Sequence, residues 1–150
     1  MPLPRASGEG VFICEGLEEG LYLKRMSDRE TEALDGEIRF LERLLHRMPS
    51  DVEVLKILAE AYTRVGRVRE GLDLDLRLKE ICPRDNVVHY NLACSLALAN
   101  RLDEAFQALR KAVELGYADL EWMNADPDLS KLRSDPRYQS EILPAFRKEK

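Results

Sequence analysis

The fold is decided by residues 52–85, which read VEVLKILAEAYTRVGRVREGLDLDLRLKEICPRD. The same order of apolar, small and charged positions recurs 34 residues later in residues 86–119, NVVHYNLACSLALANRLDEAFQALRKAVELGYAD. The matched pairs are Leu58/Leu92, Ala59/Ala93, Arg67/Arg101, Val68/Leu102, Glu70/Glu104 and Ile81/Leu115. A period of this length is typical of proteins in which one helical hairpin stacks on the next.

The register continues towards the N-terminus. Pro49 and Pro83 are 34 residues apart, and each is followed two positions later by an aspartate, Asp51 or Asp85. Two apolar columns run through three periods: Ile38/Leu72/Phe106 and Leu44/Leu78/Ala112. The chain therefore contains two full units preceded by part of a third.

Within each period the sequence predicts a helix, a short turn and a second helix. In the first unit, Asp51 caps a helix that runs to about Val65, and Gly66 ends it because glycine adopts the left-handed conformation at little cost. The second helix covers about Val68–Ile81 and stops before Pro83, since the residue before a proline avoids helical geometry. The next unit repeats this pattern, with helices at about Asn86–Ala99 and Leu102–Leu115 and turns at Asn100 and Gly116.

Residues 72–78, LDLDLRL, taken alone are ambiguous between a strand and a helix. Apolar and polar residues alternate there with a period of two, which is the signature of a half-buried strand. On a helix the leucines fall on two faces, which suits a helix packed between its own partner and the following unit. The 34-residue register decides for a helix.

The segment before Pro49 predicts one further helix, at about Asp28–Met48. Ser27 is a candidate N-cap, and Glu30, three residues later, completes a capping box. The first helix of this half or degenerate unit, residues 17–51, is either Leu17–Met26 or missing. Residues 1–16 carry glycine, proline and few apolar groups, so we expect a flexible arm.

The two full units resemble the tetratricopeptide repeat, whose pattern is roughly W-x2-L-G-x2-Y, then A-x3-F, then P. The matching positions of the unit 52–85 are Leu55, Leu58, Ala59, Tyr62, Gly71, Asp75 and Pro83, and those of the unit 86–119 are His89, Leu92, Ala93, Leu96, Ala105, Leu109 and Tyr117. The resemblance implies an all-α, right-handed superhelix of antiparallel helix pairs over residues 17–150. Asp75 and Tyr117 depart from the usual residues. Alanine at Gly71 should be stabilising if Ala59 leaves room for a methyl group.

Residues 120–150 are similar to a closing module found after many bacterial repeats of this type. Asp126-Pro127 and Asp135-Pro136 each place an N-cap carboxylate before a proline at the first helical position. We expect capping helices at Leu120–Ala125, Pro127–Arg133 and Pro136–Arg147. Large side chains of the segment from Tyr117 to Phe146 should cover the apolar edge of the second unit: Tyr117, Leu120, Trp122, Leu129, Leu132, Tyr138, Ile142 and Leu143.

By the same resemblance, the first helix of each pair lines a concave face that binds peptides. The residues expected there are Glu53, Lys56, Glu60, Thr63, Arg64, Val87, Tyr90, Asn91, Cys94 and Leu98. A solvated helix face without a ligand is the open alternative. A clamp for the C-terminal carboxylate of a chaperone is disfavoured, because Glu60 stands one turn after Lys56 and would repel a carboxylate.

Catalytic and metal chemistry have little support in the sequence. Cys14, Cys82 and Cys94 form no CxxC pair, and no four ligands have the spacing of a structural zinc site. His89 and Cys94 are five residues apart on one helix and therefore lie on different faces, so they do not suggest a nucleophile–base pair. We expect no enzyme activity, no cofactor and no metal.

Composition narrows the class of partner. The 23 Lys and Arg are outnumbered by 28 Asp and Glu, for a net charge of −5, which argues against a generic nucleic-acid binder. No apolar run approaches the ~20 residues that span a bilayer, so we expect no membrane partner. The sequence thus predicts a cytoplasmic adaptor that binds another protein or peptide. A self-associating structural protein, as a homo-oligomer, and a regulatory subunit of an enzyme are the alternatives.

Overall fold

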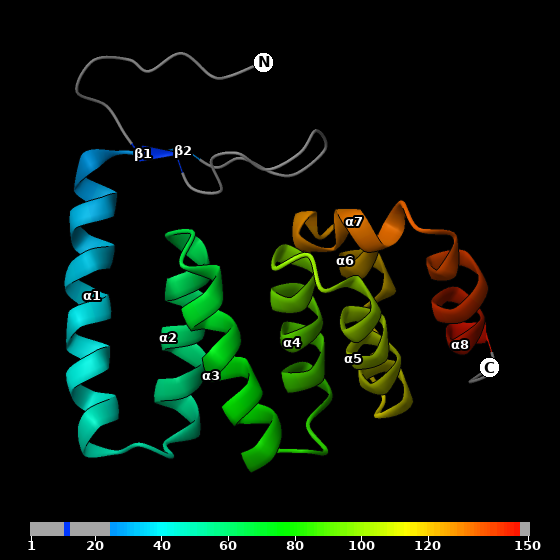
Figure 1. Cartoon of the computed structure of the whole chain (residues 1–150), viewed down its shortest axis with the longest axis horizontal. Coiled ribbons are helices and arrows are strands. Elements are labelled where there is room, and N and C mark those ends of the chain that lie inside the picture. Colours follow the sequence, from blue (N-terminus) through cyan, green and yellow to red (C-terminus); the bar gives the residue numbers. More distant parts are fainter. Residues whose placement is uncertain (1–10, 13–24, 148–150) are drawn as a thin grey trace.

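The computed structural model describes residues 11–12 and 25–147 (Figure 1). This part of the chain is all-α apart from one pair of two-residue antiparallel strands, β1 (Val11–Phe12) and β2 (Arg25–Met26). The helices are α1 (Asp28–Arg47), α2 (Val52–Arg64), α3 (Val68–Ile81), α4 (Asn86–Leu98), α5 (Leu102–Glu114), α6 (Leu120–Ala125), α7 (Ser130–Arg133) and α8 (Leu143–Arg147). A 3-10 turn, Pro127–Leu129, precedes α7, and a π-helical segment, Tyr138–Ile142, precedes α8. The helices form a row with α1 at one end and α8 at the other.

The predicted helices are confirmed with boundary shifts of one residue or less in the two full units. Asp51 accepts a hydrogen bond from the backbone N–H of Val54, so it is the N-cap of α2. Residues 72–78 lie within α3, which confirms the helical interpretation over the strand. Ser27 and Glu30 form the expected capping box at the start of α1.

The N-terminal predictions are tested only in part. Met26, the last residue of the proposed helix Leu17–Met26, belongs with Arg25 to the strand β2, so a helix does not extend that far. Residues 17–24 lie outside the described residues. The same is true of the predicted arm, residues 1–16, except for the two residues of β1.

The core divides into two apolar clusters that follow the helix pairs. One joins α1, α2 and α3 and contains Leu34, Ile38, Leu55 and Leu58. The other joins α4 and α5 to residues 117–147, which we call the closing segment. Each large apolar side chain that is fully buried contributes about 1.5–3 kcal/mol before conformational entropy is counted.

The closing segment covers α4 and α5 as predicted, with one correction. Leu129, Leu132, Tyr138 and Ile142 are all buried in the second cluster. Trp122, however, is half exposed, and the neighbouring Met123 takes the buried place. Successive residues of a helix point about 100° apart, so the short helix α6 turns only one of the two towards the core.

The condition for a stabilising Gly71→Ala, that Ala59 leaves room for a methyl group, is not met. A Cβ atom added at Gly71 would lie 2.9 Å from the Thr63 Oγ1 atom and 3.2 Å from the Ala59 carbonyl oxygen. Thr63 Oγ1 is held in place because it donates a hydrogen bond to that carbonyl. The corresponding positions of the second unit are Ala97 and Ala105, both buried. At this crossing the two units therefore fill a similar space in different ways, with Thr63 and Gly71 in the first unit and with Ala97 and Ala105 in the second.

We predict that Gly71→Ala lowers the free energy of unfolding by about 1–3 kcal/mol, because it overpacks this crossing. The double variant Thr63→Ala/Gly71→Ala reproduces the pairing of the second unit and should recover most of the loss. Urea unfolding of the two single variants and the double variant measures this coupling.

Gly36→Ala is the matched control, since nothing lies within 4 Å of a Cβ added at that helical glycine. This substitution should raise the free energy of unfolding by about 1 kcal/mol through helix propensity alone. An increase for Gly71→Ala of the same size would contradict the steric explanation.

Candidate functional site

A hollow of about 510 Å³ lies between α2, α4 and the closing segment, and we call it the groove. Seven of the ten predicted peptide-binding residues line it: Lys56, Glu60, Thr63, Arg64, Tyr90, Asn91 and Cys94. Glu53, Val87 and Leu98 are not among the residues that line it. The other lining residues are Ile57, Ala59, Asp75, Ser95, Trp122, Asp126 and Asp128.

The α2 side of the groove is polar and charged. Lys56, Glu60 and Arg64 are spaced four residues apart, so they follow one face of the helix. Lys56 lies 3.5 Å from the Asp85 carboxylate, which is the N-cap of α4. Arg64 is exposed and forms no ion pair with another described residue. This side therefore offers both signs of charge to a ligand.

Two exposed apolar side chains border the groove. Ile57 on α2 is 44% exposed, and Trp122 on α6 is 50% exposed. Neither was predicted as a site residue. Trp122 is missed because its place beside α4 depends on how the closing segment folds back, which the repeat pattern does not determine.

The α4 side of the groove is closed by a buried hydrogen-bonded cluster. The Tyr90 hydroxyl donates to Asp126 Oδ2 over 2.6 Å, and the Cys94 thiol lies 3.7 Å from the same oxygen. The Tyr90 ring stacks on Tyr117 with ring centres 4.2 Å apart. Burial, reinforced by the nearby aspartates, raises the pKa of both Tyr90 and Cys94. Both groups are therefore neutral donors at pH 7.

Two further carboxyl groups line the groove without a basic partner, and Asp75 is buried whereas Asp128 is half-buried. The Ser95 hydroxyl donates to Asp75 Oδ2. Burial nonetheless raises the pKa of Asp75 to about 6. Burial and the nearby Asp126 likewise raise the pKa of Asp128 to about 6. No Lys or Arg within residues 25–147 forms an ion pair with Asp75, Asp126 or Asp128, so this part of the groove is negative at pH 7.

Cys94, Asp126 and Asp128 also have the geometry of a candidate metal site, since their ligand atoms lie within 4.8 Å of one another. One thiolate and two carboxylates are acceptable ligands for zinc. The thiol is protonated here, and a metal would have to displace that proton. The sequence analysis missed this group because Cys94 and Asp126 are 32 residues apart.

Comparison with known proteins gives one partial match. No protein-family model matches the chain. An 80-residue stretch, 51% of the chain, is 38% identical to a chloroplastic protein from Arabidopsis thaliana. The match spans 24% of that plant protein, so it leaves most of the relative without a counterpart here. Among the described helices, none is long and apolar enough to cross a membrane.

The raised pKa of Asp75 predicts a specific pH dependence. A carboxyl group with a pKa of about 6 in the folded chain and an ordinary value in the unfolded chain binds more protons when folded. Its contribution to stability is therefore fully present below about pH 4 and is lost as pH rises through about 6, by about 3 kcal/mol in total. Asp75→Asn should remove this loss.

Urea unfolding of the wild type and Asp75→Asn between about pH 4 and pH 7 tests this expectation. The wild type should become progressively less stable than the variant across that range. Asp73→Asn, an exposed position on the same helix, is the control and should follow the wild type. A constant difference between the wild type and Asp75→Asn would show that Asp75 titrates normally.

Proposed function

We propose that the chain is a tetratricopeptide-type adaptor that binds a segment of another polypeptide in the groove. The single observation that carries the proposal is the combination in one hollow of buried or half-buried carboxylates without basic partners and exposed apolar side chains. Asp75 and Asp128 supply the former, and Ile57 and Trp122 the latter. A segment with a Lys or Arg beside an aromatic or aliphatic residue complements both.

Charge strengthens this choice of ligand. Placing carboxylates in a low-dielectric environment costs free energy, and a ligand cation close to them recovers part of that cost. Trp122 is a residue type that commonly anchors partners, because it buries a large area at a small cost in conformational entropy. The groove thereby selects for a basic side chain next to an apolar one, and against an acidic segment.

The arrangement of the helices supports the adaptor class. The pairs α2/α3 and α4/α5 repeat after 34 residues, and the first helix of each pair contributes to the groove, as in a peptide-binding superhelix. No histidine is among the described residues that line the groove. His89 Nε2 instead contacts the Pro83 carbonyl oxygen at 2.8 Å, away from Cys94. A cytoplasmic adaptor remains the proposed role, with self-association or regulation of an enzyme as alternatives.

Selection of a random-peptide display library on the full chain tests the proposal. Enriched peptides should carry Lys or Arg beside an aromatic or aliphatic residue. Measured by fluorescence anisotropy, their affinity should fall about tenfold for Asp128→Asn and for Trp122→Ala. Affinity should also fall as pH is lowered from about 7 to about 5, because Asp75 and Asp128 then become protonated.

Gln107→Ala is the matched control, because Gln107 is exposed and lines a separate hollow between α3 and α5. It should bind the selected peptides like the wild type. Equal binding by all three variants would place the ligand elsewhere. If no peptide is enriched and the mass measured by light scattering rises with concentration, the self-associating alternative is favoured.

A further inference from the structure

The outer face of α1 is not covered by any other described helix. The opposite face of α1 packs on α2 through Leu34, Ile38 and Leu41, which are all buried. Figure 1 shows α1 at the end of the row, with every other helix on one side of it. Each of the other long helices, α2 to α5, has an antiparallel partner in its own hairpin. Within residues 25–147, α1 has none.

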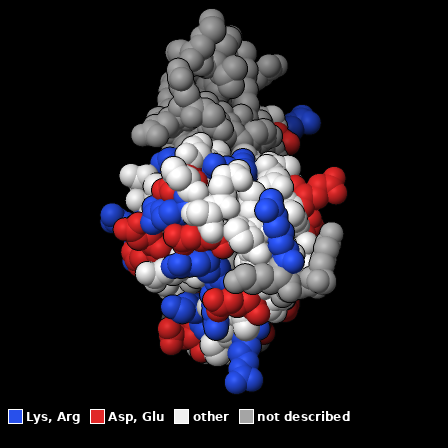
Figure 2. Space-filling view, turned by 90° about the vertical axis from the view of Figure 1, so that its right-hand side faces the viewer, with Lys and Arg blue, Asp and Glu red and all other residues white. Residues whose placement is uncertain are grey.

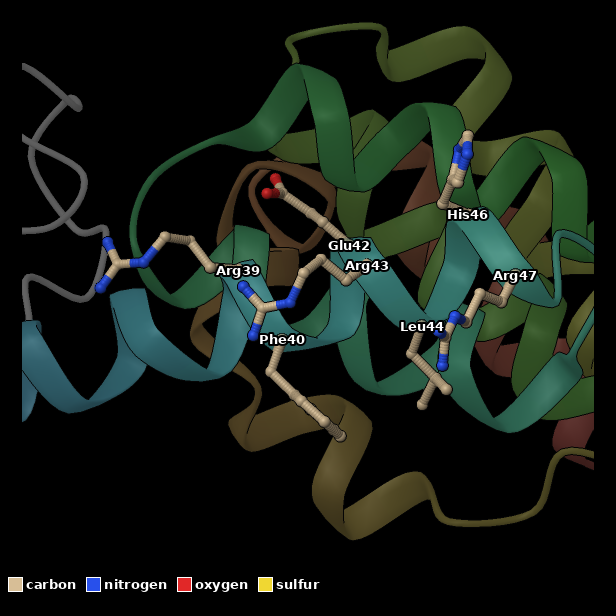
Figure 3. A pocket seen from close by; sticks show the side chains of 7 residues that line it. All are labelled: Arg39, Phe40, Glu42, Arg43, Leu44, His46 and Arg47. Carbon is tan, nitrogen blue, oxygen red and sulfur yellow. The ribbon is translucent and has the colours of Figure 1, made fainter.

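The outer face carries an apolar seam. Phe40 is 56% exposed, and with Leu44 it lines a hollow of about 730 Å³ along α1. Leu44 is half-buried at the edge of this face, because it also packs against the cluster of α1, α2 and α3. In Figure 3 the Phe40 and Leu44 side chains extend from the same side of α1, whereas Glu42 and His46 extend from the other. Ala33 and Gly36 continue the seam towards the start of the helix, at spacings of three and four residues.

Gly36 has no role in the internal packing of the described chain. Nothing lies within 4 Å of a Cβ added there, in contrast to Gly71. A glycine inside a helix costs about 1 kcal/mol relative to alanine. Small residues at Ala33 and Gly36, followed by Phe40, provide the surface on which a second helix can approach closely. The four seam positions are separated by three, four and four residues, close to one helical turn each, so they follow one face of α1.

The half of the seam formed by Phe40 and Leu44 is bordered by positive charge, whereas the exposed Glu32 and Glu37 stand beside Ala33 and Gly36. Arg39, Arg43 and Arg47 line the same hollow, and none forms an ion pair with another described residue. Glu42, the acidic residue among the described side chains that line the hollow, is engaged elsewhere. It accepts a hydrogen bond from the Tyr62 hydroxyl at 2.7 Å and lies 3.5 Å from Arg67. The chain as a whole has a net charge of −5, so this is a local reversal of sign.

We propose that the outer face of α1 is a second binding surface, which takes an acidic amphipathic helix of another protein. The ligand helix lies along the seam of Ala33, Gly36, Phe40 and Leu44. Its Asp and Glu side chains pair with the three arginines. This surface is distinct from the groove, and the two select ligands of opposite charge.

The opposite end of the row of helices, at α8, does not have such a positively charged face. Figure 2 looks onto that end, and there Lys and Arg side chains alternate with Asp and Glu. Two of the contacts are the ion pairs Arg110–Glu141 at 2.9 Å and Arg137–Asp103 at 2.6 Å. These charges are thus satisfied within the described chain, whereas Arg39, Arg43 and Arg47 have no ion pair with a described residue.

A display library of helical heptad peptides, with the apolar and flanking positions randomised, tests the proposal on the full chain. Selected peptides should carry leucine or another apolar residue at the seam positions and Asp or Glu at the flanking ones. Arg43→Glu and Phe40→Ala should each weaken their binding about tenfold or more. Gly36→Leu should weaken it as well, because the larger side chain occupies the seam, while thermal melting shows the variant to be folded.

Arg84→Glu is the charge-matched control, since Arg84 is exposed in the turn between α3 and α4, and it should bind like the wild type. Gly36→Ala should melt at a higher temperature than the wild type, and this result would show that folding does not require a glycine at this position. Failure to enrich peptides over an Arg43→Glu counter-selection would overturn the proposal. So would equal binding of peptides with Lys at the flanking positions, or displacement of the acidic peptides by duplex DNA.

Discussion

The contact between Tyr90 and Asp126 joins the repeat to the segment that closes it. The Tyr90 hydroxyl donates to Asp126 Oδ2 inside the protein, and the other carboxylate oxygen of Asp126 caps the following 3-10 turn by accepting from the Asp128 N–H. A buried hydrogen bond to a charged acceptor is stronger than a neutral one, and it fixes orientation as well as distance. Because α6 and α7 flank Asp126, this bond sets their position against α4. The position of α6 and α7 against α4 therefore determines how the groove is closed on that side.

The helix α4 is the most enclosed of the described helices, because α3, α5 and the closing segment all pack against it. Nine of its residues are buried, including the polar His89 and Ser95. Each of those two has a partner: His89 contacts the Pro83 carbonyl, and Ser95 donates to Asp75. Asp75 stands where the neighbouring periods have Leu41 and Leu109, both buried. The chain therefore gives up hydrophobic packing at one position of a regular column and gains a carboxylate that faces the groove.

Local signals in the sequence account for most of the fold. Asp51, Ser27 and Glu30 cap helices because side-chain oxygens near a helix start satisfy backbone N–H groups, and such signals need no tertiary information. The helix at residues 72–78 could be predicted only from the 34-residue register, since their own pattern favoured a strand equally. The close packing at Gly71 could not be predicted, because it depends on where Thr63 Oγ1 lies in the folded pair. Seven of the predicted site residues do line the groove, whereas its acidic part was missed, because Asp126 and Asp128 reach α4 only through the path of the closing segment.

Two surfaces of opposite charge on one short row of helices suggest how the chain would be used. The groove lies between α2 and α4, and the proposed helix-binding face lies on the outer side of α1, so a ligand on one surface does not displace a ligand on the other. The two surfaces are nevertheless connected. Glu42 of α1 accepts a hydrogen bond from the Tyr62 hydroxyl of α2, and the Arg67 guanidinium lies 4.3 Å from the centre of the Tyr62 ring. An acidic ligand that competed with Glu42 for Arg67 would loosen this contact between α1 and α2. Binding at α1 would then change the packing of α2, which forms one side of the groove. A chain of this size would thus bring a basic segment and an acidic helix together and make each sensitive to the other.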